Sequence, residues 1–315
     1  MDIPQVVSHE EWLAARRELL AREKEVTRAE DAVDAARRAL PVTEVTKAYT
    51  FAGPAGQASL ADLFDGHRQL ITYHFMWRHA ESGFPGEDQG CPTCSFLVDS
   101  IGDLSHLHAC DTTLVLVSRA PIASIERFRK RMGWAVPWYS SHGGDFNYDF
   151  HVSFDEAIAP LEYDYMDTET LGRKAPYIRS GTDGPGASVF LRADGRVYHT
   201  YSAYARGLDP LLGTYRWLDL TPLGRQRHVT EFPHHDTYGT DSLRAKLDLG
   251  DKVGDRQAAI GRMRGHRVPR GRLSARHCAV WPHVAAGTCV DCPEREQRER
   301  QWAQSRAWAP AGCRG

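Results

Sequence analysis

Two cysteines separated by two residues carry the strongest chemical signal in the sequence. The segment Cys91-Pro92-Thr93-Cys94 follows a strand-like run and a loop, and it stands at the start of a helix-like run. Backbone N–H groups and the positive dipole end at a helix N-terminus favour a thiolate, which is the nucleophilic form of cysteine. A second sulfur two residues on can attack a mixed disulfide formed on the first. The motif predicts that Cys91 attacks and Cys94 resolves in thiol–disulfide exchange.

The pair leaves other interpretations open. A closed zinc site needs four ligands, and His74 and His79 are near the cysteines in the sequence. Together with Cys91 and Cys94 they could form a zinc or copper site in a metal-binding protein or metalloenzyme. A third interpretation is a partner-binding module without catalytic activity, which dimerises through an N-terminal helix. We favour the redox interpretation because the pair opens a helix.

The elements that must position the pair alternate between strands and helices. Residues 67–77 and 112–118 are predicted to be buried strands, and residues 95–109 and 120–134 to be helices with an apolar face. A hairpin over residues 187–202 closes the pattern. This order predicts an α/β fold with one central mixed sheet and helices on both faces.

A long amphipathic helix is predicted before this pattern. Ser8 is a suitable N-cap with Glu11 placed as in a capping box, and Pro41 follows the last turn. We therefore divide the chain into an N-terminal helix over residues 1–41 and an α/β domain over residues 42–239.

The remaining residues, 240–315, are rich in arginine and glycine, and their apolar periodicity fades. We expect them to form a poorly ordered tail. A second pair of cysteines, Cys289 and Cys292, lies there with three thiol or imidazole groups upstream, His277, Cys278 and His283. These are enough ligands for one zinc ion, but we favour a solvated charged tail.

The composition is that of an ordinary globular protein. Of 315 residues, 42% are apolar and 25% are charged, and the formal net charge of −2 argues against binding to nucleic acid or an anionic membrane. The sequence contains no membrane-spanning run and no secretory signal at its start, so we expect a cytoplasmic protein. Thiols there are mostly reduced, which favours a catalytic or metal-binding pair over a structural bridge. No glycine-rich phosphate loop occurs, and we expect no organic cofactor.

Several longer segments resemble one protein family. They are ITYHFMW, GCPTCSF, LVLVSRAPIASIERFRKRMGW, PWYSSHGGDFNYDF and YARGLDPLLGTYRWLDLTPLGR. They are similar to the thioredoxin-like family catalogued as domain of unknown function 899, over about residues 5 to 240. Members of this family are described as predicted dithiol–disulfide oxidoreductases. The resemblance implies a thioredoxin-like fold with Cys91 and Cys94 at the active site, a disulfide- or peroxide-containing substrate and an external thiol reductant.

The resemblance also directs attention to a loop rich in aromatic and polar residues. In a thioredoxin-like sheet this loop lies opposite the cysteines, and sites are often built on such loops. We expect four of its side chains to bind substrate, namely Trp134, Trp138, Asp145 and Asn147. The alternative is that the tryptophans pack in the core and that Asp145 or Asn147 caps a turn. Thioredoxin relatives also carry a cis-proline before the strand facing the cysteines, where this chain has Ala187 and Ser188 with Pro185 upstream.

Overall fold

The computed structural model describes residues 4–78, 88–176 and 178–239. These residues belong to one compact unit, residues 1–248. The tail predicted to be poorly ordered, with its second cysteine pair, lies outside the described residues. Within the described part, no helix combines the length and apolar character needed to cross a bilayer.

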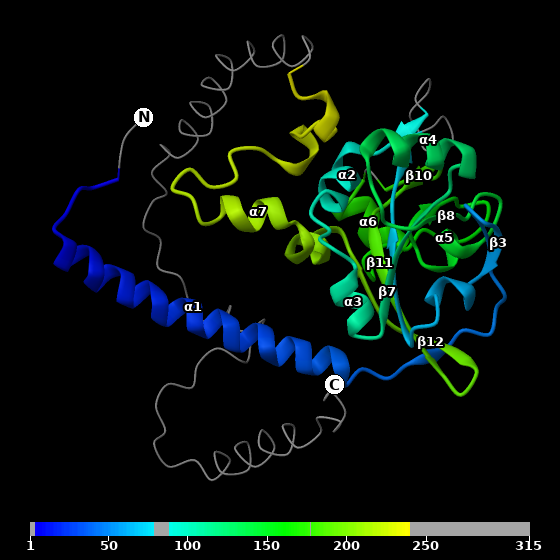
Figure 1. The fold of residues 1–315 in the computed structure, drawn as a ribbon, viewed down its shortest axis with the longest axis horizontal. Coiled ribbons are helices and arrows are strands. Elements are labelled where there is room, and N and C mark those ends of the chain that lie inside the picture. Colours follow the sequence, from blue (N-terminus) through cyan, green and yellow to red (C-terminus); the bar gives the residue numbers. More distant parts are fainter. Residues whose placement is uncertain (1–3, 79–87, 177, 240–315) are drawn as a thin grey trace. The chain divides into compact units, whose positions relative to one another are not determined.

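The predicted N-terminal helix is confirmed as α1 (His9–Arg38), drawn in blue in Figure 1. Ser8 and Glu11 form the capping box, in which the Ser8 hydroxyl accepts from the Glu11 N–H and the Glu11 carboxylate accepts from the Ser8 N–H. None of the residues of α1 is buried. The division of the chain at residues 41 and 239 stays a prediction.

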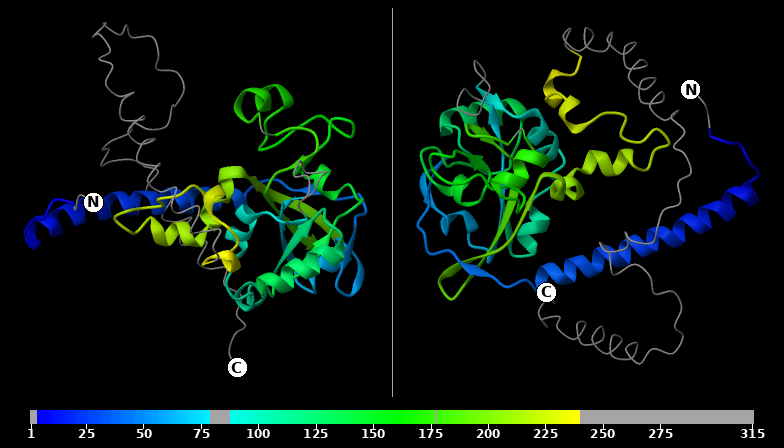
Figure 2. Two further views of the ribbon diagram at one scale, coloured as in Figure 1. Left: turned by 90° about the horizontal axis from the view of Figure 1, so that it is seen from above. Right: turned by 180° about the vertical axis from the view of Figure 1, so that it is seen from behind.

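The described strands form one large sheet of eight and two short ribbons (Figures 1 and 2). The order in the sheet is β1 (Thr43–Glu44), β12 (Arg196–Tyr204), β11 (Gly186–Ala193), β4 (Gln69–His74), β7 (Thr112–Ser118), β8 (Trp138–Ser140), β2 (Thr50–Gly53) and β3 (Gly56–Ser59). The ribbons pair β5 (Trp77–Arg78) with β6 (Gln89–Gly90) and β9 (Ser153–Phe154) with β10 (Thr182–Asp183).

Strand directions identify the fold type. β4 and β7 are parallel neighbours, as are β7 and β8, whereas β11 runs antiparallel to β4 and β12 antiparallel to β11. The helix that follows β4 begins at the cysteine pair. A mixed sheet with this order and this helix is of the thioredoxin-like type, as predicted.

Helices cover both faces of the sheet. They are α2 (Pro92–Val98), α3 (Ser105–Ala109), α4 (Ile122–Met132), α5 (Phe146–Asp149), α6 (Thr168–Lys174) and α7 (Gly213–Leu218), with short 3₁₀ turns η1 (Asp62–Phe64), η3 (Ala205–Leu211), η4 (Val229–Glu231) and η5 (His235–Thr237). The helix predicted over residues 95–109 is two helices, α2 and α3, separated by a segment that contains Gly102, a residue of low helix propensity.

Side chains along the central strands point alternately to the two faces of the sheet, and a separate hydrophobic core lies on each face. In β7, Leu116 packs with Phe128 of α4 and Leu97 of α2, whereas Val115 and Val117 pack on the opposite face among residues of η1 and α5. Successive side chains of a strand point to opposite faces. A strand buried on both faces has a continuous apolar sequence. This explains the apolar run within the β7 sequence, TTLVLVS.

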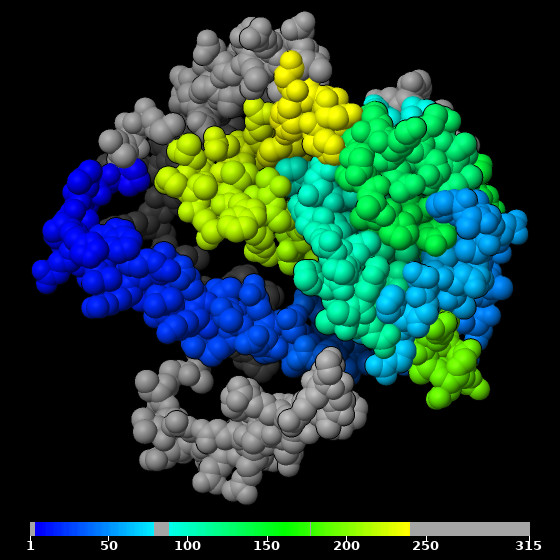
Figure 3. Space-filling view, in the orientation of Figure 1, coloured from blue at the N-terminus to red at the C-terminus, as the bar shows by residue number. Residues whose placement is uncertain are grey.

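The chain after β12 covers the outer side of α2. The Phe96 ring lies 5.2 Å from Tyr215 of α7 and 4.5 Å from Phe232, between ring centroids. The space-filling view in Figure 3 shows this yellow-green and yellow segment beside the cyan residues of α2. The cysteine-bearing helix is therefore held between the sheet and the segment over residues 213–239.

Candidate active site

The ribbon of β5 and β6 brings Cys91 back to the end of β4. Trp77 pairs with Gly90, and the Cys91 N–H donates to the Met76 carbonyl over 3.1 Å. A Cβ on Gly90 would lie 2.5 Å from the Phe128 ring, so only glycine allows this close approach. Cys91 then caps α2 with extended backbone (φ −65°, ψ 129°), and Pro92 occupies the first helical position.

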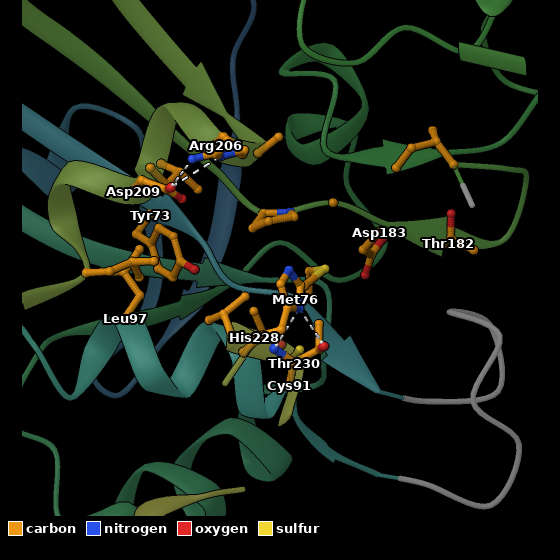
Figure 4. A pocket seen from close by; sticks show the side chains of 18 of the residues that line it. Tyr73, Met76, Cys91, Leu97, Thr182, Asp183, Arg206, Asp209, His228 and Thr230 are labelled. Atoms are coloured by element: carbon orange, nitrogen blue, oxygen red, sulfur yellow. Dashed lines mark hydrogen bonds and ion pairs between the residues drawn. The ribbon is translucent and has the colours of Figure 1, made fainter. Parts of the chain in front are cut away.

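Cys91 lies on the wall of a cavity of about 950 Å³. Its exposed fraction is only 6%. Figure 4 shows it beside Met76, with Tyr73 and Leu97 on one wall and Asp183 and Thr182 on another. A reagent must therefore enter the cavity to reach the sulfur.

The surroundings of Cys91 favour its thiolate. Its pKa is lowered to about 6, chiefly because the Cys94 thiol donates a hydrogen bond to the Cys91 sulfur. Burial opposes this shift, while the Cys94 N–H, the Arg78 guanidinium and the Thr93 N–H add to it. With this pKa, most Cys91 side chains are ionised at neutral pH.

The pKa of Cys94 is shifted in the opposite direction. Cys94 is fully buried, and burial, followed by the neighbouring Cys91 sulfur, raises its pKa well above the ordinary range. The Met76 N–H donates to Cys94 Sγ over 3.4 Å, and the Tyr73 hydroxyl also donates to this sulfur. At neutral pH the pair consists of a thiolate facing the cavity and a protonated thiol behind it.

A family described as "Bacterial protein of unknown function (DUF899)" matches residues 1–238. The chain belongs to the DUF899 family. No curated protein matches it.

The solved structures similar to this DUF899 chain include a peroxidoxin, a peroxiredoxin and a thiol peroxidase. The peroxidoxin BcpB from Mycobacterium tuberculosis is 14% identical, with 57% of this chain and 97% of that chain covered and a TM-score of 0.36. A cysteine-to-serine mutant of peroxiredoxin Q from Xanthomonas campestris is 14% identical, with 56% of this chain and 98% of that chain covered and a TM-score of 0.35. A thiol peroxidase from Chromobacterium violaceum is 15% identical, covering 67% and 92%, with a TM-score of 0.30. The thioredoxin-like assignment rests on the strand order and the cysteine-bearing helix, not on these likenesses.

The four side chains predicted to bind substrate do not line the cavity next to Cys91. Trp138 is fully buried and its indole donates to Ser118 Oγ, while the Trp134 indole donates to Asp99. Asp145 precedes α5 and forms an ion pair with Lys47 over 2.8 Å. Asn147 is buried, where it accepts from Ser141. Trp138 packs in the core, and substrate binding by these four side chains stays a prediction.

The structure gives little support to the metal interpretation of the DUF899 cysteines. His74 follows Tyr73 in β4, and alternation turns its ring to the opposite side of the sheet from the cysteines, among Phe146 and Phe150. Its Nε2 hydrogen-bonds Ser188 Oγ, and burial lowers its pKa to about 3. No group of three or more His, Cys, Asp or Glu side chains suited to a metal occurs among the described residues. His79 lies outside them.

Several cavity residues were not predicted from the sequence. Tyr73 contacts Cys94, and Arg78 acts on Cys91 through its charge. The far wall comes from the segment over residues 205–230. The sequence contained a signal for Tyr73, since it is the last residue of β4 that alternation places on the cysteine side. Pro185 also lines the cavity, and no peptide bond among the described residues is cis.

Proposed function

We propose that this DUF899 protein is a dithiol–disulfide oxidoreductase in which Cys91 attacks and Cys94 resolves. The feature that carries the proposal is the unequal pair: Cys91 lines a cavity wall and has a lowered pKa, whereas Cys94 lies behind it with a raised pKa and donates a hydrogen bond to the Cys91 sulfur. Perturbed pKa values in a cavity are typical of catalytic groups. A structural pair buried in a core would not need one sulfur to be ionised.

The reaction proceeds in two exchanges. The Cys91 thiolate attacks one sulfur of a substrate disulfide, forms a mixed disulfide and releases the first substrate thiolate. The Cys94 thiol then loses its proton and attacks the Cys91 sulfur, which releases the second substrate thiolate. The substrate gains two electrons and the pair becomes a disulfide. An external thiol reductant restores the dithiol by the reverse steps.

Two donors assist the second exchange. Cys94 must become a thiolate in a buried place, which burial alone disfavours. The Met76 N–H and the Tyr73 hydroxyl both donate to the Cys94 sulfur, and they stabilise the charge that develops there. Tyr73 is therefore a positioning residue for the resolving step.

A peroxide could serve as the oxidant at the same pair. The Cys91 thiolate would take one oxygen atom, and an alcohol or water would leave. Cys94 would then condense with the Cys91 sulfenic acid and release water. Both oxidants produce the same intramolecular disulfide.

The proposal is tested by the stoichiometry of one oxidation. Reduced protein treated with a small excess of bis(2-hydroxyethyl) disulfide is expected to release two equivalents of 2-mercaptoethanol for the Cys91–Cys94 pair. They are counted as the difference from a Cys91→Ser/Cys94→Ser protein, because each of the other five cysteines can release one equivalent of its own. It is also expected to lose two hydrogen atoms in the peptide that holds both cysteines, and dithiothreitol should reverse the change. Hydrogen peroxide is run in parallel to compare the rates of the two oxidants. If Cys91 and Cys94 stay reduced with both reagents, the proposal is wrong.

A further inference from the structure

We infer that the cavity selects small disulfides that carry carboxylate groups. This inference rests on the proposed function and names the class of substrate for the same site. Its basis is the charge that lines the cavity. Five arginines contribute to the wall, namely Arg78, Arg179, Arg206, Arg225 and Arg227, against two acids, Asp183 and Asp209.

Both acids of the wall are already neutralised by the protein. Asp183 forms a largely buried ion pair with Arg119, at 3.3 Å. Asp209 pairs with Arg206 at 3.1 Å and with Arg225 at 3.7 Å. Figure 4 shows the Arg206–Asp209 pair away from Asp183. The acids therefore do not cancel the charge of Arg179 and Arg227.

Arg179 and Arg227 are the arginines available to a ligand. Both are exposed and both line the cavity. Neither forms an ion pair with an acid in the part of the chain that the structure describes. Arg179 precedes β10 and Arg227 precedes η4, so two separate segments contribute a cation to the cavity. A guanidinium binds a carboxylate through two parallel hydrogen bonds.

The size and depth of the site favour a small molecule over a protein. The cavity of about 950 Å³ is within the range that holds small ligands. With an exposed fraction of 6%, Cys91 offers little surface to a disulfide on another protein. Apolar side chains such as Met76, Leu97 and Leu208 also line the space. A disulfide on short carbon arms that end in carboxylates matches these features.

Three disulfides that differ mainly in charge test the inference. They are 3,3′-dithiodipropionate, which is anionic, bis(2-hydroxyethyl) disulfide, which is neutral, and cystamine, which is cationic. The rate of Cys91–Cys94 disulfide formation with each is divided by its rate with free 2-mercaptoethanol, because the three differ in intrinsic reactivity. The corrected rate is expected to be about tenfold higher for the anionic than for the cationic disulfide at low salt, and the ratio should fall as salt is added.

Variants assign the preference to the two arginines. In the double variant Arg179→Gln/Arg227→Gln, the ratio of the corrected rate for the anionic disulfide to that for the cationic one is expected to fall to within about twofold of unity. Arg173→Gln is the matched control, since Arg173 is exposed in α6, pairs with Glu169 and does not line the cavity. It should keep the wild-type ratio.

The outcomes separate this inference from the proposed function. If all three reagents oxidise the pair with equal corrected rates, the charge selection is wrong while the oxidoreductase stands. If the double variant keeps the preference, its assignment to Arg179 and Arg227 is wrong, and the oxidoreductase again stands. If none of them produces the intramolecular disulfide, both proposals are wrong.

Discussion

Replacing Cys91 with serine is expected to abolish disulfide reduction, with a loss of about 1000-fold or more in the rate of substrate thiol release. The Cys91 sulfur is the ionised one and the only one of the pair that lines the cavity. A serine hydroxyl is not ionised near neutral pH and forms no disulfide, so the covalent route is removed. The measurement is the release of thiol from bis(2-hydroxyethyl) disulfide by the reduced protein.

A matched variant makes this result specific. Cys110 is an exposed free cysteine outside the cavity wall, and Cys110→Ser should release thiol at the wild-type rate. Thermal unfolding of both variants checks that the fold is intact. A folded Cys91→Ser protein that retains the wild-type rate would show that another group reacts with the substrate.

Replacing Cys94 with serine is expected to stop turnover after the first exchange. The variant should release one equivalent of substrate thiol and keep the other half of the substrate as a mixed disulfide on Cys91, with steady-state turnover reduced by about 100-fold or more. Serine is chosen because its hydroxyl can still donate to the Cys91 sulfur, as the Cys94 thiol does. Intact-protein mass spectrometry measures the adduct.

Cys94→Ala completes this comparison. Alanine removes the donor that contributes most to the lowered pKa of Cys91. The alanine variant should therefore form the same adduct more slowly than the serine variant at pH 7, and the two rates should converge at high pH. A Cys94→Ser protein that turns over repeatedly would contradict the resolving role of Cys94.

The sequence predicted the parts of the structure that local patterns determine. The cysteine pair, the capping box at Ser8 and the apolar run of β7 each lie within a few neighbouring residues, and each is found where it was expected. The thioredoxin-like sheet followed from the order of strands and helices and from the family resemblance. These features depend on helix capping and on strand periodicity, which a single sequence contains.

The cavity wall could not be predicted in the same way. It joins Cys91 to segments more than 100 residues away, such as the one that carries Arg206 and Arg227. The loop with Trp134 and Trp138 contained residue types suited to a site, but large aromatic side chains fill cores equally well. Trp138 is fully buried. Composition alone did not distinguish these two roles, because the burial of each ring depends on contacts distant in the sequence.

The most direct test of the central claim is the pH dependence of Cys91 alkylation. The thiolate is the reactive form, so the rate with iodoacetamide should rise as the pH passes through about 6 and reach a plateau above pH 7. Peptide mass spectrometry separates Cys91 from Cys110, and at pH 7 Cys91 should label faster although Cys110 is more exposed. In urea the inflection for Cys91 should move up toward about 8.5, the ordinary thiol value. An inflection that stays near this value in the folded protein would contradict a thiolate stabilised at the cavity.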